Sequence, residues 1–377
     1  MKIDTLIYGD SWKRAQEEQI VDRSKASIIF VFGDSDFLCA EAPFAELRKL
    51  YPHAKIVGAS SAGHILGSKI ADCPIVATAV QMEKGYVATA TVDFADGDDV
   101  GTIAGNLVSR LPREGLRHVF VLSDGLRLNG SDLVRGINAC LGTVPVTGGM
   151  AGDGARFQAT HVVSDEPGKQ RRIVAVGFYG TELVISAGCF SGWSDFGGNR
   201  RVTKSKGNVL YELDHQPALD LYKKYLGEFA ADLPNSGMRF PLSIKERVGR
   251  PEIIRTLLAI DEAEKSITFA GDVPEGYTAR LMKPDIDVLI DGAKQAAAQI
   301  KQVEDCQALG LVVSCTGRKV VMSQLIEEEL EVVGDVLGKQ VQLTGFYSYG
   351  EIAPFPNDDV HCQLHNQTMT LTAIYER

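Results

Sequence analysis

The chain lacks an excess of positive charge and lacks any long apolar segment. Its 377 residues include 39 Lys and Arg against 49 Asp and Glu, which gives a formal net charge of -10. Phosphate binding needs clustered cations, so this balance argues against nucleic acid and anionic membranes as main partners. No stretch approaches the apolar length that spans a bilayer, and we therefore expect no membrane insertion.

Paired cysteines are also missing. The cysteines are odd in number and scattered, with no C-x-x-C spacing, which argues against a disulfide framework and against a zinc knuckle. The first residues, 1–5, lack the apolar core of a secretory signal. We therefore expect a reduced, cytoplasmic protein. The seven cysteines are Cys39, Cys73, Cys140, Cys189, Cys306, Cys315 and Cys362.

No motif of a well-known enzyme class occurs. The sequence contains no G-x-S-x-G, no H-E-x-x-H and no kinase set, and its glycines do not follow the G-x-G-x-x-G pattern of dinucleotide sites. Its composition, 45% hydrophobic and 23% charged, is ordinary for a globular protein. The length allows two or three domains.

The first half of the chain alternates strand and helix patterns. A continuous apolar run such as 27–32 is typical of a buried parallel strand, and alternation of this kind favours an α/β layer. The expected strands are 2–8, 27–32, 55–58, 76–82, 86–94 and 118–122, and the expected helices are 10–22, 43–51, 98–111 and 131–141.

The second half begins with successive strands and then returns to alternation. The strands 157–163, 173–179, 183–190 and 201–204 predict an antiparallel extension. A helix follows near 216–222, and the polar segment 227–251 is interpreted as a surface connection. Beyond it we expect strands 253–260, 266–270, 309–315, 341–347 and 368–375 and helices 285–303 and 318–333. No repeat at a solenoid period is found.

The predicted fold class is therefore α/β: a two-part chain with mixed sheets flanked by helices and an antiparallel extension in the middle. We divide it into residues 1–215 and 216–377.

Ligands of open α/β sheets bind in loops at the carboxyl ends of strands. Polar, glycine-bearing turns fall at such places at 33–36, 60–64 and 123–125, and in the stretch 144–163. Together they predict the edge of a pocket. Because clefts favour domain interfaces, we expect that pocket between the two parts.

The stretch 144–163 contains Gly148, Gly149, Gly152 and Asp153. Glycines let a ligand or another backbone come close, and successive amides can form an anion-binding nest. Asp153 could accept a hydrogen bond from a ligand or cap a turn. A tight strand connection that binds nothing explains the same residues.

A second candidate is the sequence Ser314-Cys315-Thr316-Gly317-Arg318. It places Cys315 at the end of an apolar strand and the start of a helix, close to Arg318. A helix N-terminus and a guanidinium lower the pKa of a thiol, which predicts a reactive or ligand-facing cysteine. A small buried residue at a strand end is the alternative interpretation.

The third candidate region lies near the C-terminus. Tyr349 and Glu351 stand between glycines and could form the wall of a small-molecule pocket, or a strand end with its turn. His361 and His365 are four residues apart, a spacing that suits metal binding. No third zinc ligand is evident. A single axial histidine is enough for haem, and without C-x-x-C-H it would be non-covalent haem b.

Taken in order along the chain, these motifs resemble the FIST family, with its FIST N and FIST C parts. The similar segments cover nearly the whole length: 27–33, 58–63, 121–124, 147–153 and 201–221 in the first part, and 314–318, 345–352 and 364–370 in the second. The last contains Asn366. His64 departs from the pattern, because an acidic residue is expected after Gly63.

The resemblance implies a bacterial or archaeal sensory module that binds a small ligand, with amino acids as one proposed class. It also implies a haem-binding subgroup that senses nitric oxide and controls histidine kinases or cyclic-di-GMP enzymes.

The predicted function is a cytoplasmic small-ligand sensor that acts through a separate partner protein and is not an enzyme, with haem-based nitric oxide sensing as its sharpest version. The alternatives are an enzyme that uses Cys315 as a nucleophile and a scaffold that binds nothing. The candidate ligand-binding residues are Gly148, Gly149, Gly152, Asp153, Ser314, Cys315, Gly317, Arg318, Tyr349, Glu351 and Asn366, and the candidate haem ligands are His365 and His361.

Overall fold

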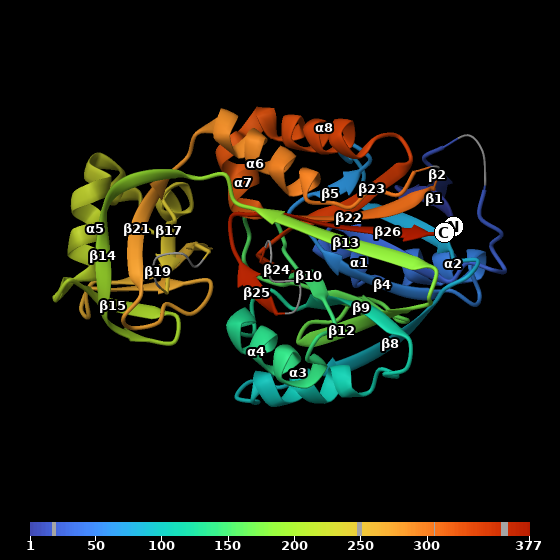
Figure 1. The fold of residues 1–377 in the computed structure, drawn as a ribbon, viewed down its shortest axis with the longest axis horizontal. Coiled ribbons are helices and arrows are strands. Elements are labelled where there is room, and N and C mark those ends of the chain that lie inside the picture. Colours follow the sequence, from blue (N-terminus) through green and yellow to red (C-terminus); the bar gives the residue numbers. More distant parts are fainter. Residues whose placement is uncertain (17–19, 247–250, 305, 356–360) are drawn as a thin grey trace.

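In the described residues, three six-stranded sheets and one eight-stranded sheet form the framework of the fold (Figure 1). The computed structural model describes residues 1–16, 20–246, 251–304, 306–355 and 361–377. The first sheet has the order β11(Val162–Ser164), β4(Lys55–Ser60), β3(Ile28–Gly33), β7(Ile75–Gln81), β1(Lys2–Tyr8), β2(Trp12–Arg14). The second has the order β25(Cys362–His365), β24(Gly350–Pro354), β10(Val146–Met150), β9(Leu116–Ser123), β12(Arg172–Tyr179), β8(Tyr86–Asp93). The third has the order β13(Leu183–Phe190), β26(Met369–Glu376), β22(Ala308–Cys315), β23(Val341–Ser348), β5(His64–Leu66), β6(Lys69–Ile70).

The three six-stranded sheets share one plan. Each is built on a parallel pair, which is β3–β4, β9–β10 or β22–β23. A later strand of the same unit, β7, β12 or β26, pairs antiparallel with the first member of that pair. The unit's opening strand, β1, β8 or β13, then lies antiparallel on the outer side of that later strand. The described part of the chain therefore contains three copies of one β/α unit, although no repeat at a solenoid period is found in the sequence.

The three units exchange strands in a cycle. After its parallel pair, the first unit sends β5 to β23 of the third sheet, the third unit sends β24 to β10 of the second, and the second unit sends β11 to β4 of the first. No sheet is complete without a strand from another unit. The three sheets consequently form one interlocked body, which we call the core.

Apolar side chains fill the space between the inner faces of these sheets. Phe32 of the first sheet stacks on Phe346 of the third with ring centroids 4.8 Å apart, and Phe30 meets Phe120 of the second edge to face at 5.9 Å. Helices cover the outer faces. α2(Glu41–Leu50) packs on the first sheet, α3(Val100–Ser109) and α4(Gly130–Leu141) on the second, and α6(Ile286–Ala298) and α8(Ile326–Leu337) on the third (Figure 1).

Residues 194–283 form an inserted unit between β13 and α6 of the third β/α unit. Its sheet has the order β18(Ile253–Arg255), β17(Leu242–Lys245), β21(Thr278–Lys283), β14(Ser194–Lys206), β15(Val209–Leu213), β20(Ser266–Phe269), β19(Leu257–Asp261), with β16(Gln216–Pro217) beside β15. α5(Ala218–Leu226) packs against it and completes a hydrophobic cluster of this unit, and the short 3-10 helices η1(Gly227–Asp232) and η2(Asn235–Arg239) follow. The inserted unit stands beside the core and joins it through the two connecting segments (Figure 1).

The α/β fold class with mixed sheets, flanking helices and an antiparallel extension is confirmed, and most expected strands and helices are present. The expected helix at 10–22 is wrong, because 12–14 pair with β1 as a strand; its residues 17–19 lie outside the described residues. The expected helix at 318–333 is divided into α7(Thr316–Met322), the turn η3(Ser323–Leu325) and α8. The connection at 227–251 contains η1, η2 and β17, and the expected strand at 157–163 covers only 162–164. Among the described residues, no helix is long and apolar enough to cross a membrane.

Close approach of the paired strands depends on glycine at equivalent positions. A Cβ placed on Gly58, Gly148 or Gly345 would lie 1.9, 1.9 or 1.8 Å from the carbonyl oxygen of a valine on the neighbouring parallel strand. Gly148 and Gly345 also have φ values of +151° and +158°, which side-chain-bearing residues rarely adopt.

We expect Gly148→Ala to lower the free energy of unfolding by about 3 kcal/mol or more, because the added methyl group collides with the backbone of Val121. Gly198→Ala is the matched control, since Gly198 is exposed and a Cβ there meets nothing within 4 Å. Urea unfolding measures both. Equal stability of the two variants would contradict the proposed role of the close strand contact.

Candidate functional site

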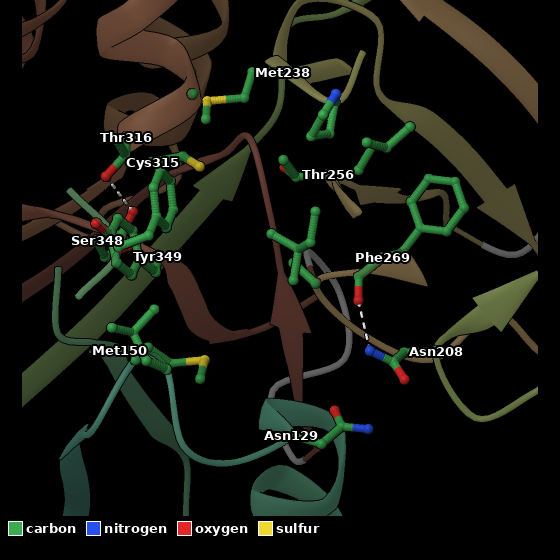
Figure 2. A pocket seen from close by; sticks show the side chains of 18 of the residues that line it. Asn129, Met150, Asn208, Met238, Thr256, Phe269, Cys315, Thr316, Ser348 and Tyr349 are labelled. Carbon is green, nitrogen blue, oxygen red and sulfur yellow. Dashed lines mark hydrogen bonds between the residues drawn. The ribbon is translucent and has the colours of Figure 1, made fainter. Parts of the chain in front are cut away.

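A cavity of about 670 Å³ lies between the core and the inserted unit (Figure 2). On the core side it is formed by the carboxyl ends of two parallel pairs: the loop after β9, the end of β10, the junction of β22 with α7, and the end of β23. On the other side it is formed by η2, β19, β20 and neighbouring residues. The core residues that line it are Gly125, Leu126, Arg127, Leu128, Asn129, Met150, Phe157, Cys315, Thr316, Gly317, Ser348 and Tyr349. Those from the inserted unit are Asn208, Pro234, Asn235, Met238, Thr256, Leu257, Leu258, Phe269 and Ala270.

Of the predicted site residues, Cys315, Gly317 and Tyr349 line this cavity. The parallel register of β22 and β23 sets Cys315 beside Ser348. Thr316 Oγ1 donates to the Ser348 carbonyl oxygen at 2.8 Å, which ties the start of α7 to the end of β23. A Cβ on Gly317 would lie 2.2 Å from the amide of Gln367, so glycine keeps this wall closely packed.

Tyr349 and Phe157 form an aromatic pair at the cavity wall. Their rings stack with centroids 4.6 Å apart and 12° between the planes. The Tyr349 hydroxyl donates to the carboxylate of Asp153 and lies 2.9 Å from the Gly154 carbonyl oxygen. The aromatic pair therefore depends on Asp153 for its position.

Asp153 itself caps the loop that carries Phe157. Its carboxylate accepts the backbone N–H groups of residues 157, 158 and 159 at 3.0, 2.8 and 2.9 Å. Burial acts to raise the pKa of Asp153, but the Tyr349 hydroxyl and these amides outweigh it and hold the pKa below its usual value. Of the two roles expected for this carboxylate, the structure shows the turn cap.

Glu351 lies fully buried behind the same wall. It accepts hydrogen bonds from Ser348 Oγ at 2.6 Å and from the Oγ1 and backbone N–H of Thr368 at 2.9 and 3.1 Å. Burial raises the pKa of Glu351 to about 7, although these hydrogen bonds and one from the Cys315 thiol favour the ionised form. Glu351 does not line the cavity itself, but it accepts hydrogen bonds from two residues that do, Ser348 and Cys315.

The lowered pKa expected for Cys315 is wrong. The residue is buried, and loss of solvation, reinforced by the negative field of Glu351, raises the pKa of its thiol well above the usual value. Arg318 is too deeply engaged to offset this: its guanidinium pairs with Glu329 at 2.8 Å and donates to the Leu289 carbonyl oxygen at 2.8 Å. Ser314 also donates to Glu329, at 3.0 Å, so both residues serve packing of the core.

The predicted glycines of β10 lie in the core and not in the cavity wall. Gly148 and Gly149 belong to the buried strand, with Gly149 opposite Glu351 in the antiparallel pairing of β10 with β24. A Cβ on Gly152 would lie 3.2 Å from the backbone nitrogen of Ala62 and 3.3 Å from the Tyr347 carbonyl oxygen. These positions favour close strand packing over an anion-binding nest.

The candidate histidines lie apart from the cavity. His365 is buried on β25, its Nε2 is 3.0 Å from the Ala353 carbonyl oxygen, and its ring meets Phe355 edge to face. Burial lowers its pKa to about 4, so the imidazole is neutral. His361 is exposed. Asn366 is fully buried, and within the described part of the chain neither atom of its side-chain amide has a hydrogen-bond partner. The described residues contain no group of three or more His, Cys, Asp or Glu side chains arranged to hold a metal ion.

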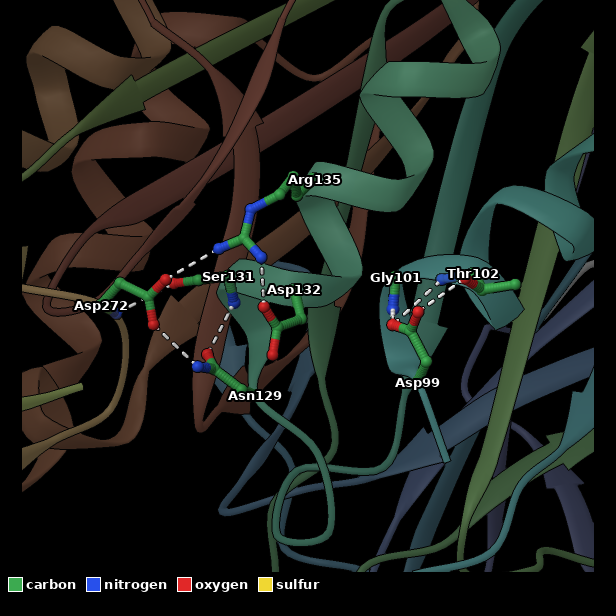
Figure 3. Close-up of polar contacts among 8 residues, drawn as sticks. All are labelled: Asp99, Gly101, Thr102, Asn129, Ser131, Asp132, Arg135 and Asp272. Carbon is green, nitrogen blue, oxygen red and sulfur yellow. Dashed lines mark hydrogen bonds and ion pairs between the residues drawn. The ribbon is translucent and has the colours of Figure 1, made fainter. Parts of the chain in front are cut away.

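Polar contacts link the core to the inserted unit at Asn129, which lines the cavity (Figure 3). Asp272 of the inserted unit accepts from Asn129 Nδ2 at 2.8 Å and from Arg135 at 2.9 Å, and its backbone N–H donates to Ser131 Oγ at 3.0 Å. Asn129 also caps α4 by accepting from the Ser131 N–H at 2.9 Å. In the same view Asp99 caps α3 through Gly101.

The inserted unit's half of the cavity was not predicted. Thr256, Phe269 and Met238 lie in ordinary strand and turn patterns that carry no chemical signature.

On the core side, the sequence carries one signal for Asn129, because asparagine before a helical pattern is a frequent N-cap. We instead expected that helix to begin at Ser131.

Comparison with known proteins identifies the family. The FIST N domain matches residues 27–216 and the FIST C domain matches residues 218–354. The chain therefore belongs to the FIST family, whose domains are sensory domains of signal transduction that bind small ligands.

Other likenesses are more distant. An uncharacterized protein of Methanocaldococcus jannaschii is 28% identical over 237 residues, covering 55% of this chain and 45% of that protein, so the chain spans less than half the length of that relative. Two cyanuric acid hydrolase structures, one from A. caulinodans, share 9% identity with TM-scores of 0.37 and 0.35 over 95% of this chain and 92% of theirs. These scores are too low to carry an argument about function.

Because the pKa of Glu351 in the folded protein lies above its ordinary value of 4.5, the folded state binds a proton more tightly than the unfolded state does. The free energy of unfolding should therefore fall as pH rises from about 4.5 to about 7, by about 3 kcal/mol from this group. We expect the stability difference between wild type and Glu351→Gln to change by about that amount between about pH 5 and about pH 8.

Urea unfolding at the two pH values checks this. Glu328→Gln, which alters an exposed carboxylate on α8, should leave the pH dependence as in wild type. A pH-independent difference for Glu351→Gln would show that Glu351 does not titrate in this range.

Proposed function

We propose that this protein is a cytoplasmic sensor that binds a small molecule in the cavity between the core and the inserted unit and reports its presence to a separate partner protein. The observation that carries the proposal is the cavity itself. It has the size of a small-molecule site, and it is lined by both of the FIST segments.

Each side of the cavity belongs to a body that has a hydrophobic cluster of its own. The inserted unit has its own packed interior, and it meets the core through two connecting segments, through Ile254 and Met282, which pack in a core cluster, and through polar contacts. Among the polar contacts are those of Asp272 and of Arg255, which donates to the Leu364 carbonyl oxygen at 2.9 Å. A ligand that touches both sides favours one relative position of the two bodies. Binding can thereby be passed to a partner as a change in surface.

We propose a histidine kinase or a cyclic-di-GMP enzyme as the partner protein. These partner classes rest on the family resemblance. The alternative of a Cys315 nucleophile has less support, because a buried thiol with a raised pKa stays protonated at neutral pH and thiolate is the reactive form.

A thermal-shift screen of small metabolites tests the sensor proposal. We expect at least one compound to raise the unfolding temperature of wild type, and we expect Ala270→Trp, which places a large ring in the cavity, to weaken its binding by about tenfold or more. Ala263→Trp is the control, because Ala263 is exposed on the same unit and does not line the cavity. A compound that binds Ala270→Trp as tightly as wild type would place its site elsewhere.

The haem-based nitric oxide sensor stays a prediction, and the described geometry does not fit it. Neither His365 nor His361 lines the cavity, and the ring of His365 is buried and packs edge to face on Phe355. An axial ligand needs a free ring nitrogen directed at the iron.

Visible spectra of the protein after addition of haem, and then of nitric oxide, test this version. From the geometry we expect His365→Ala to leave the visible spectrum the same as that of wild type. His215→Ala, which alters an exposed histidine of the inserted unit, serves as the control. A band that shifts with nitric oxide and disappears only in His365→Ala would establish the haem sensor against the arrangement described above.

A further inference from the structure

We propose that the cavity selects an uncharged, largely apolar organic molecule that carries a hydrogen-bonding group, and that it rejects zwitterions such as free amino acids. This inference rests on the proposed function, because it names the ligand class of the same site. It follows from how the charges around the cavity are placed.

The cavity wall itself offers almost no charge. Arg127 is the one lining residue, among those described, with a permanently charged side chain, and it is exposed on the loop after β9. The wall is otherwise built of apolar side chains together with amides and hydroxyls. A carboxylate or ammonium group bound there would give up part of its hydration with only the exposed guanidinium of Arg127 as a charged neighbour in the wall, which disfavours its binding.

The ionisable groups just behind the wall are already occupied by protein partners. The carboxylate of Asp153 accepts three backbone amides and the Tyr349 hydroxyl. Glu351 is surrounded by donors from Ser348 and Thr368. Arg255 donates to the carbonyl oxygens of residues 272 and 364, both at 2.9 Å. None of these groups is left to pair with a charge on a ligand.

The apolar contacts come from both sides of the cavity (Figure 2). Met150 and the stacked ring of Tyr349 belong to the core, and Met238, Leu257 and Phe269 belong to the inserted unit. Aromatic and thioether side chains suit the faces and edges of a planar apolar molecule. A volume of about 670 Å³ gives room for a drug-sized compound.

Among the described residues that line the cavity, one buried side-chain oxygen is left without a hydrogen-bond partner. Thr256 is 8% exposed and lines the cavity, and its Oγ1 has no hydrogen-bond partner in the described structure. Most buried hydroxyls are paired, so an unpaired one beside a cavity marks a place for a hydrogen bond from a ligand. We assign Thr256 as the residue that selects the ligand's polar group.

A matched pair of fluorescent probes tests the inference. N-phenyl-1-naphthylamine is uncharged, and 8-anilinonaphthalene-1-sulfonate has the same rings with an added sulfonate. We expect the uncharged probe to bind wild type at one saturable site, with a Kd about tenfold or more below that of the anionic probe. Ala270→Trp should weaken the uncharged probe by about tenfold or more, and Ala263→Trp should leave it unchanged.

Thr256→Val and Thr256→Ser separate shape from hydrogen bonding, because the probe's N–H can donate to a hydroxyl. We expect Val to weaken the uncharged probe by about three- to tenfold and Ser to retain its affinity. Equal affinity of all three proteins would remove Thr256 from the inference.

Three results would overturn the ligand class itself: tighter binding of the anionic probe, binding of neither probe, or probe binding that Ala270→Trp does not change. If a charged metabolite stabilises wild type but not Ala270→Trp while the uncharged probe fails, the sensor proposal stands and only the ligand class is wrong.

Discussion

The structure depends on the backbone contact within each parallel strand pair of the core. At Gly58, Gly148 and Gly345 the two strands approach so closely that no side chain fits between them. Beyond each glycine the chain leaves its own sheet and joins a neighbouring one, which brings the carboxyl ends of β10 and β23 together. The core side of the cavity is built at this junction, from residues as distant in sequence as Asn129 and Tyr349.

The ionisable side chains behind the cavity wall are paired with other groups of the protein. The buried ion pair of Arg318 and Glu329 fixes α7 against α8 and keeps the guanidinium away from Cys315. Asp153 is used to shape a loop and to hold Tyr349 in place. The cavity wall therefore carries few charged or reactive side chains, although several ionisable groups lie just behind it. This arrangement suits reversible binding better than covalent chemistry.

The sequence predicted the local elements better than their assembly. Continuous apolar runs such as 27–32 and 309–315 correctly predicted buried strands. Polar turns at strand ends predicted the edge of a pocket, and Gly125 and Tyr349 from these regions line the cavity. The threefold repeat cannot be found in the sequence, because equivalent strands of the three units need the same pattern of buried positions but not the same residues. Thr256 and Phe269 were missed because a cavity between two bodies depends on their relative placement, which periodicity does not encode. Arg318 was misjudged for the same reason, since its partner Glu329 lies on another helix.

Strand exchange also affects the order in which the protein can fold during synthesis. The second sheet needs β24, which ends at Pro354, to cover the edge of β10, although β8, β9 and β12 of the same sheet are complete by Tyr179. While the ribosome adds the intervening residues, including the whole inserted unit, the apolar edge of β10 stays open. An uncovered strand edge is a template for wrong pairing with other chains. A nascent chain of this fold therefore carries an aggregation hazard for much of its synthesis, which is resolved only when its last strands emerge.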